Sequence, residues 1–305
     1  MIVTLKEVLQ KAHNNNYAVG AFNINNMEIL QAVVSAAEKL KSPVIVQTSE
    51  GAIKYAGLDM LYHMVNSISE FTSIPIVLHL DHGQNLETVK HCIKIGYSSV
   101  MFDGSHLEFE KNVKLTKQVV QIAHKEDISV EGELGTIGGA EDLLSARKIL
   151  YTDPEAAKEF VEKTNVDALA VAIGTSHGAY KFNGKANLDI NRLKEINKKV
   201  KIPLVLHGAS GVPDWLVKEA TKYGARLGKP EGVPESQIKQ AIKNGVDKIN
   251  TDTDLRLAFD AAVRKVLREQ PSDFDPRHVL APARELIQKV VEHRIKLFGS
   301  AGKSK

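Results

Sequence analysis

The sequence predicts an α/β protein of the (β/α)8 barrel class, with extra helices at its C-terminal end. Short, almost continuously apolar runs recur along the chain, and stretches with helical periodicity separate them. Parallel strands that are covered on both faces need such runs. The length of 305 residues is ordinary for an α/β barrel, although it is long for an average domain. We therefore expect one barrel domain over residues 1–305.

Eight apolar runs are predicted as the barrel strands: residues 18–24, 43–49, 75–80, 99–103, 129–134, 168–174, 203–207 and 247–250. The alternative for this pattern is an open, doubly wound sheet. That fold needs a glycine-rich dinucleotide turn after an early strand, and the chain has none there. The motif GTIGGA follows only the fifth run and carries little weight alone. The barrel is therefore the preferred prediction.

Helices are predicted between the strands at residues 25–40, 86–95, 113–124, 153–164, 214–223 and 254–268. Asp153 is placed to cap its helix, because Pro154 suits the first helical position. Residues 276–298 read as one or two helices beyond the barrel, and the final GSAGKSK as a frayed tail. The residues before the first strand are amphipathic and lack the layout of a signal peptide.

Composition argues against several classes of protein. The net charge is +3, and the basic residues are spread along the chain, so we expect neither nucleic-acid binding nor membrane association. No apolar stretch approaches the roughly 18 to 20 residues needed to span a bilayer. The single cysteine, Cys92, excludes an internal disulfide and suits a reducing compartment, so a cytoplasmic location is expected. Cys92 is predicted to pack in the core from a helix.

Three histidines stand where apolar runs end: His82, His177 and His207. In a barrel the carboxyl ends of the strands build the active site. Three imidazoles converging there would form an open zinc site with one position left for substrate. His79 lies inside its strand, three residues before His82, and is predicted to be packed or hydrogen-bonded on the other face.

Polar side chains also end the other predicted strands. They are Asn23; Gln47, Ser49 and Glu50; Asp81; Asp103 and Ser105; Glu131 and Glu133; Ser176; Ser210; and Asn250, Asp252 and Asp254. The short loops HGAYK, HGASG and NTDTD follow the last three strands. Backbone N–H groups in such loops form anion sites, and barrel phosphate sites usually involve the loops after strands seven and eight. The glycines could also simply form tight turns between strand and helix. From the residues alone, phosphate binding and a purely structural turn are about equally supported.

Five blocks of sequence resemble the signature blocks of the class II, zinc-dependent fructose-1,6-bisphosphate aldolases. They are LHLDHG, VEGELG followed by GG and an acidic residue, AVAIGTSHGAY, LHGASG and KINTDTD. The blocks stand in the family's order between residues 23 and 256, so the resemblance covers essentially the whole chain. It implies reversible cleavage of fructose 1,6-bisphosphate to dihydroxyacetone phosphate and glyceraldehyde 3-phosphate, in glycolysis and gluconeogenesis.

The resemblance also implies the metal site and the proton transfers. It makes His82, His177 and His207 the ligands of one zinc ion per subunit. Glu133 and Asp103 become supporting groups or an alternative metal position. Asp81 would move the proton at the C4 oxygen, Glu141 would move the proton on the triose phosphate, and Asn250 would hold the enediolate whose charge the zinc ion stabilises. Family members often carry two acidic residues at the Glu141 turn, and the first of these is Ala140 here.

The remaining site residues are implied contacts to substrate and phosphate: Asn23, Ser49, Gly178, Lys181, Gly208, Ser210, Asp252, Thr253, Asp254 and Arg256. A monovalent cation (Na⁺ or K⁺) held by backbone carbonyls would lie beside one phosphate. Barrel enzymes of this kind are commonly homodimers or homotetramers, and Arg256 would act in its own or in a neighbouring subunit.

Three alternatives stay open at this point. Tagatose 1,6-bisphosphate differs from the fructose sugar by one stereocentre, and the TDTDLR stretch favours fructose. A Schiff-base aldolase needs a lysine at a strand end, whereas Lys248 precedes the rim and Lys181 lies past a loop. A sugar-phosphate sensor without activity would need the binding groups but not the proton-transfer pair Asp81 and Glu141.

Overall fold

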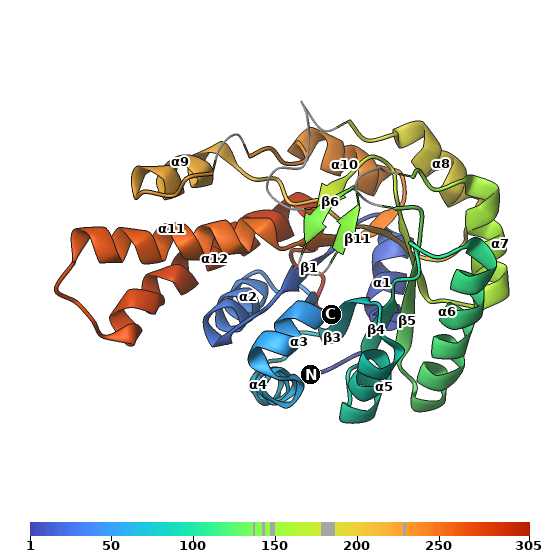
Figure 1. The fold of residues 1–305 in the computed structure, drawn as a ribbon, viewed down its shortest axis with the longest axis horizontal. Coiled ribbons are helices and arrows are strands. Elements are labelled where there is room, and N and C mark those ends of the chain that lie inside the picture. The colour runs from blue at the N-terminus through green and yellow to red at the C-terminus, as the bar shows by residue number, and fades with distance from the viewer. Residues whose placement is uncertain (137, 142–143, 147–149, 178–186, 228–229) are drawn as a thin grey trace.

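The computed structural model describes residues 1–136, 138–141, 144–146, 150–177, 187–227 and 230–305, without the side chains of residues 138–141, 144–146 and 177. Eight parallel strands close into a barrel in the order β1-β11-β10-β8-β5-β4-β3-β2 (Figure 1). They are β1 (Val19–Asn23), β2 (Val44–Ser49), β3 (Ile76–Gly83), β4 (Ser99–Phe102), β5 (Ser129–Leu134), β8 (Ala168–Val171), β10 (Leu204–Leu206) and β11 (Val246–Thr251). Each lies within or overlaps a predicted run, so the predicted barrel is confirmed.

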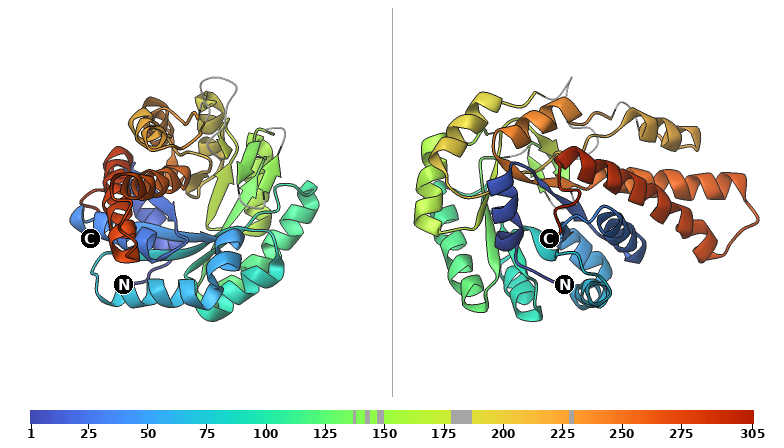
Figure 2. Two further views of the ribbon diagram at one scale, coloured as in Figure 1. Left: turned by 60° about the vertical axis from the view of Figure 1, so that its left-hand side comes forward. Right: turned by 180° about the vertical axis from the view of Figure 1, so that it is seen from behind.

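Helices surround the barrel and extend beyond it (Figures 1 and 2). They are α1 (Leu5–Asn15), α2 (Met27–Lys39), α3 (Glu50–Ala56), α4 (Leu58–Glu70), α5 (Leu86–Ile95), α6 (Phe109–Ala123), α7 (Pro154–Thr164), α8 (Ile190–Lys199), α9 (Asp214–Lys222), α10 (Glu235–Lys243), α11 (Thr253–Glu269) and α12 (Pro276–Phe298). A short 3-10 turn, His124–Glu126, follows α6. Asp153 caps α7 as predicted, accepting the N–H groups of Glu155 and Ala156. Cys92 is buried in α5, also as predicted.

Alternate strand residues face two different cores. Strand residues such as Phe22, Val46 and Leu78 join the large core beneath the surrounding helices. Strand residues of the other face, including Ala21, Ile45 and Val205, pack inside the barrel against Leu5 and Leu9 of α1 and their neighbours. Helix α1 therefore closes the amino-terminal end of the barrel, and the site must lie at the other end.

Two features of the structure depart from the predicted organisation. A small sheet in the order β7-β6-β9 lies outside the barrel, formed by Leu144–Ala146, Gly138–Glu141 and Ser176–His177. Residues 276–298 form one helix, α12, which is one of the two predicted arrangements. The expected frayed tail is wrong: Ser300 is buried and bonded to Ser42, and Ser304 N–H donates to the Lys41 carbonyl.

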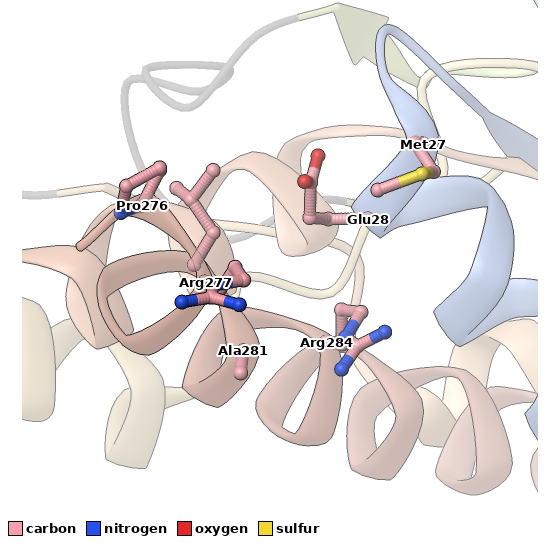
Figure 3. A pocket seen from close by; sticks show the side chains of 7 residues that line it. Met27, Glu28, Pro276, Arg277, Ala281 and Arg284 are labelled. Atoms are coloured by element: carbon pink, nitrogen blue, oxygen red, sulfur yellow. The ribbon is translucent and has the colours of Figure 1, made fainter.

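Helices α11 and α12 form a hairpin that projects from the barrel, and α12 packs on α2 (Figure 2). Where α12 crosses the start of α2, a pocket of about 300 Å³ opens at the surface (Figure 3). It is lined by Met27, Glu28, Pro276, Arg277, Leu280, Ala281 and Arg284. Arg284 also donates to the side chain of Gln31 at 2.8 Å, which ties the two helices together at this point. This pocket lies outside the cluster of histidines and carboxylates described next.

Candidate active site

The end of strand β3 is irregular, and this irregularity shapes the site. Pairing with β4 runs from His79 opposite Ser99 and Leu80 opposite Val100 to Gly83 opposite Phe102, so β3 carries one extra residue. His82 takes a left-handed backbone conformation at φ 50°, which is uncommon outside glycine and concentrates at functional sites. A regular strand would point Asp81 and His82 to opposite faces. The bulge instead brings both side chains into one buried cluster with His207.

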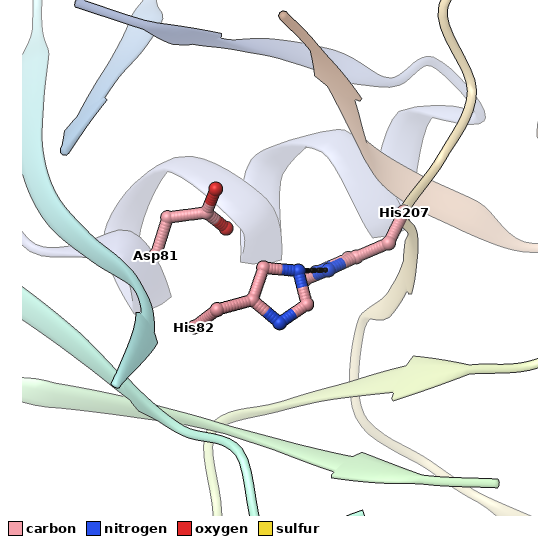
Figure 4. Close-up of side chains that lie close together, drawn as sticks. All are labelled: Asp81, His82 and His207. Carbon is pink, nitrogen blue, oxygen red and sulfur yellow. Dashed lines mark hydrogen bonds between the residues drawn. The ribbon is translucent and has the colours of Figure 1, made fainter. Parts of the chain in front are cut away.

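The imidazoles of His82 and His207 meet at the mouth of the barrel. His82 comes from β3, and His207 directly follows β10, on the far side of the barrel. Their rings lie at 86° to one another, and His82 Nε2 is 2.7 Å from His207 Nδ1 (Figure 4). Donor atoms of Asp81, His82 and His207 all lie within 4.8 Å of one another, which is close enough for them to bind one metal ion.

Carboxylates behind the two rings define which nitrogens face each other. His82 Nδ1 lies 2.9 Å from Asp103, and His207 Nε2 lies 2.7 Å from Glu131. A carboxylate only accepts hydrogen bonds, so each of these nitrogens carries the hydrogen. Although burial would lower the pKa of His82, the charge of Asp81 and the Asp103 hydrogen bond raise it well above its usual value, so without a metal His82 can donate from Nε2 to His207 Nδ1. With a divalent ion bound, both facing nitrogens would instead present lone pairs to the ion. Carboxylate-bound histidines of this kind are typical metal ligands, so the donor set fits a divalent ion.

Asp103 and Glu133 form a second donor group with His82, also within 4.8 Å. Burial alone would raise the pKa of Asp103, but its hydrogen bonds from His82 and Ser105 lower it well below the usual range. Burial and the charge of Asp103 raise the pKa of Glu133 well above its usual value. In the absence of a metal, Asp103 therefore favours its charged form, and Glu133 favours its protonated form, more strongly than a free carboxyl group does.

Three amide side chains surround Asp81. Asn23 donates to Oδ2 at 2.9 Å, Gln47 donates to the same oxygen at 3.1 Å, and Asn250 donates to Oδ1 at 3.0 Å. Burial would raise the pKa of Asp81, but the nearby charges of His82 and His207 and the Asn23 bond lower it below its usual value. Asp81 is thus a carboxylate at neutral pH. Gln47 had no role predicted from sequence, although it shares the inward face with Ser49.

A buried ion pair lies directly behind His207. Lys248 Nζ is 2.9 Å from Glu131 Oε2, and both side chains are fully buried. His79 Nε2 lies 3.5 Å from the same oxygen, and His79 Nδ1 bonds to Ser99. His79 is packed and hydrogen-bonded as predicted, but its expected place on the other face is wrong, because the β3 bulge follows it. Lys248 is inaccessible for a Schiff base, since it is buried and paired.

The loops after β10 and β11 touch one another beside this cluster. Gly208 has φ 59°, and a side chain there would come within 2.6 Å of the Ser176 carbonyl, so this loop lies against β9. Ser210 is buried, and its hydroxyl accepts the N–H of Asp252 at 3.3 Å. Thr253 begins α11. Arg256 is exposed, and its Nη2 lies 2.7 Å from Asp252 Oδ2. Ser49 lies elsewhere on the rim, where its hydroxyl accepts the N–H of Ala52 in the first turn of α3.

Four predicted site residues fall wholly or partly outside the part of the chain that the structure describes. Gly178 and Lys181 lie outside the described residues. His177 is placed only by its backbone in β9, which pairs with β6 through Gly139. Glu141 ends β6, so the backbone segments that hold Glu141 and His177 are neighbours.

Asp254 was expected near a substrate phosphate. The structure instead buries it fully, with its carboxylate bonded to Gly211, Val212 and Arg294.

Comparison with known proteins identifies the relatives of this site. The family model of class-II fructose-bisphosphate aldolases matches residues 3–227 and 230–303. The chain belongs to this family. A fructose-bisphosphate aldolase from Thermus caldophilus is 50% identical over 306 residues, covering all of both chains. One from Helicobacter pylori (strain ATCC 700392 / 26695) is 47% identical, over 99% of this chain and 100% of the relative.

Solved aldolase structures show the same fold. The YdjI aldolase from Escherichia coli K12 superposes with a TM-score of 0.84 at 34% identity, and the match covers 100% of both chains. A putative fructose-1,6-biphosphate aldolase from Coccidioides immitis gives a TM-score of 0.82 at 29% identity, over 98% of this chain and 97% of that one. Within the described residues of this family member, no helix has the length and apolar character required to cross a bilayer.

Proposed function

We propose that the protein catalyses the reversible aldol cleavage of fructose 1,6-bisphosphate to dihydroxyacetone phosphate and glyceraldehyde 3-phosphate. Membership of the class-II family supports the reaction class. The observation that carries the proposal is the meeting of His82 and His207 beside the Asp81 carboxylate. Breaking the C3–C4 bond requires removal of the C4 hydroxyl proton and leaves negative charge on the ketone oxygen of the resulting enediolate. A cation site adjacent to a charged carboxylate answers both requirements.

His82 and His207, with His177 as the third ligand, would hold a zinc ion. When bound there, zinc supplies Lewis-acid stabilisation of the charge that develops on the ketose oxygens. Asp103 and Glu131 orient the two described rings and make them better ligands, because each accepts the hydrogen of the nitrogen that faces away from the metal. Glu133 and Asp103 offer an alternative metal position with His82.

Asp81 is suited to take the proton from the C4 hydroxyl in cleavage and to return it in condensation. Its lowered pKa keeps it charged at neutral pH, and the amides of Asn23, Gln47 and Asn250 orient it. Asn250 can also donate to the developing enediolate oxygen as a neutral partner. Glu141 would exchange the proton on the triose phosphate from the β6 segment, a position that can close over bound substrate.

The loops after β10 and β11 would bind a substrate phosphate. Barrel phosphate sites use these loops, and the start of α11 presents backbone N–H groups beside Ser210. Gly178, Lys181, Gly208, Ser210 and Thr253 make up this proposed phosphate site, and Asn23 and Ser49 would contact substrate. Asp252 would bind a substrate hydroxyl, and Arg256 the far phosphate. A monovalent cation (Na⁺ or K⁺) beside the first phosphate is also proposed. Turnover measured in potassium chloride should then exceed turnover measured in choline chloride at the same ionic strength.

We also propose that residues 1–305 act as one domain, that the chain is cytoplasmic, and that it forms a homodimer or homotetramer. In the single chain, Arg256 is bound to Asp252, while its side chain is 44% exposed. An Arg256 that reaches a neighbouring site would require at least a dimer. Sedimentation analysis, combined with mixing of Arg256→Ala and Asp81→Ala subunits, tests this, because activity returns in mixed oligomers only if Arg256 acts across subunits.

Cleavage of fructose 1,6-bisphosphate by the purified protein, coupled to triose phosphate detection, tests the proposed function. We expect turnover that a chelator abolishes and zinc restores. Inactivation by borohydride in the presence of substrate would instead support a Schiff base. Zinc-loaded protein that binds the bisphosphate without turnover would make it a sensor. Turnover of tagatose 1,6-bisphosphate that equals or exceeds that of the fructose sugar would overturn the choice of substrate.

A further inference from the structure

Arg294, near the end of α12, is a charged side chain buried deep in the protein. It is only 2% exposed and is among the largest fully buried side chains of the described residues. Arginine is almost never fully buried unless it is paired. Its Nε donates to Asp254 Oδ2 at 2.9 Å, and its Nη2 donates to the same oxygen. Arg294 thus links the C-terminal helix to the first turn of α11.

Asp254 in turn binds the backbone of the loop after β10. Its Oδ1 accepts the N–H of Val212 at 2.8 Å, and its Oδ2 accepts the N–H of Gly211 at 3.2 Å. The carboxylate is fully buried, so these backbone groups and Arg294 are the partners that satisfy it. Burial would raise the pKa of Asp254, but the Arg294 charge and the hydrogen bonds lower it, which keeps the carboxylate ionised.

The backbone that Asp254 holds is strained. Val212 has φ 45°, a conformation that is rare for a β-branched residue and persists only where the surroundings impose it. The Asp254 bond to the N–H of Val212 itself provides such a constraint. Gly208, at the other end of the same loop, is also left-handed, with φ 59°. The loop therefore has two unusual backbone positions with Ser210 between them.

Gly211 is held between Arg294 and a second glycine. A side chain at Gly211 would come within 2.0 Å of Arg294 Nη2, so the guanidinium lies directly against the loop backbone. A side chain at Gly232 would come within 2.2 Å of the Gly211 carbonyl carbon. Contact from both sides leaves the loop little freedom to change shape. The same loop follows His207 and contains Gly208 and Ser210 of the proposed phosphate site.

We propose that Arg294 is a positioning residue for the loop of residues 208–212, which it holds through Asp254 in the shape that receives a substrate phosphate on backbone N–H groups other than those of Gly211 and Val212, which Asp254 binds. This inference rests on the proposed function, because the phosphate is that of the sugar or triose phosphate. Arg294 lies behind the loop and bonds Asp254, so it acts on phosphate affinity without contact to the reacting atoms.

The test compares Arg294→Met and Arg294→Lys with the wild-type protein, with Glu292→Gln as a matched control. Glu292 lies one turn or less from Arg294 on α12 and pairs with Lys39 of α2 at 2.9 Å, so Glu292→Gln weakens the docking of α12 without touching the loop. Four quantities are measured for each protein: KM and kcat for fructose 1,6-bisphosphate, bound zinc, and the rise in Tm caused by inorganic phosphate. The last quantity reports phosphate binding independently of activity.

We expect Arg294→Met to raise KM about tenfold, equivalent to about 1.4 kcal/mol, to reduce the phosphate-induced rise in Tm, and to leave kcat within about threefold. Bound zinc should stay at one ion per chain. Arg294→Lys keeps the charge but loses the planar two-nitrogen contact, so an increase in KM of about threefold is expected. Glu292→Gln should keep the wild-type KM, even where its Tm falls.

Wild-type KM and a wild-type phosphate effect in both Arg294 variants would overturn the inference, whatever their Tm. A lower kcat with unchanged KM would also overturn it, because that pattern indicates a smaller folded fraction. If Arg294→Met fails to fold, Arg294→Lys decides, and failure of both would make the pair a determinant of folding rather than of phosphate binding. Absence of any wild-type cleavage would instead contradict the proposed function.

Discussion

The two ends of the barrel interior differ in chemistry, although the same strands build both. At the amino-terminal end, Leu5, Val8 and Leu9 of α1 pack against small and β-branched strand residues. At the mouth, the inward residues are imidazoles, carboxylates and amides. The change occurs between successive inward-facing residues of a strand. On β1, Asn23 is the next inward residue after Ala21, and at the end of β10 His207 is the next one after Val205. Apolar packing thus gives way to polar chemistry within two residues.

Between these ends lies the Glu131–Lys248 ion pair, with His79 beside it. A buried pair of this kind is weak evidence for stability, because desolvation offsets much of the attraction. Its position below His207 suggests a different reason for its presence. Glu131 forms an ion pair with Lys248 through one oxygen and orients His207 with the other. The comparison therefore predicts that changes at the closed end alter stability, whereas changes toward the mouth alter metal binding and turnover.

The largest expected effect on stability is at the closed end. Leu9→Ala should lower the free energy of unfolding by about 2 to 5 kcal/mol, because it opens a cavity at a fully buried position. The kcat/KM of the folded protein should stay unchanged, since Leu9 lies at the end opposite the site. Urea unfolding and steady-state kinetics measure the two quantities. The control is Leu267→Ala on α11, where the side chain is exposed, with an expected change within about 0.5 kcal/mol. Equal stability losses in both variants would contradict the assignment of α1 as a packed closure.

An intermediate effect is expected in the layer below the metal site. Glu131→Gln should weaken zinc binding about 10- to 100-fold, because His207 loses its charged partner. Competition with a chelating dye gives the affinity. The double variant Glu131→Gln/Lys248→Met removes the unpaired buried cation that the single change leaves, and it should recover stability but not zinc affinity. Wild-type zinc affinity in both variants would show that Glu131 serves only to pair Lys248.

The smallest effect concerns the pH dependence at the closed end, where Asp247 lies 2.8 Å from His13 of α1. Burial raises the pKa of Asp247 from 3.8 to about 6. The native state then binds this proton more readily than the unfolded chain, so the stability it contributes is full below about pH 4 and is lost as pH rises through about 6. Asp247→Asn lacks this dependence.

Between pH 4 and 7 the Asp247→Asn variant should therefore gain stability relative to the wild type, on the order of 1 kcal/mol. Urea unfolding at several pH values measures the difference. His13→Asn is the control, because it removes the partner but leaves Asp247 able to titrate. Parallel pH profiles of Asp247→Asn and the wild type would contradict the assigned shift.

The sequence was informative wherever local patterning decides the structure. All eight barrel strands were predicted, because strands covered on both faces need continuous apolar runs. The same reasoning placed Asp81, His82 and His207 at strand ends, where the structure brings their donor atoms together. Family resemblance, rather than patterning, supplied their proposed roles.

What the sequence did not predict depends on contacts between distant segments. The β3 bulge turns His82 toward the inward face that His79 shares, so the alternation rule wrongly placed these two histidines on opposite faces. The pairing of Glu131 with Lys248 and of Asp254 with Arg294 joins residues that no spacing connects. The tail is predicted to be frayed, yet Ser300 is buried against Ser42. The composition of a chain end does not show whether the end packs against another part of the protein.

The central claim is that the mouth holds a metal on histidines and uses a separate carboxylate for proton transfer. The most direct test measures zinc content and fructose 1,6-bisphosphate cleavage together in His82→Ala and Asp81→Ala. We predict that His82→Ala loses both the metal and turnover. Asp81→Ala should keep the metal and lose about 10²- to 10⁴-fold in kcat. Retained zinc and activity in His82→Ala, or wild-type turnover in Asp81→Ala, would contradict the account.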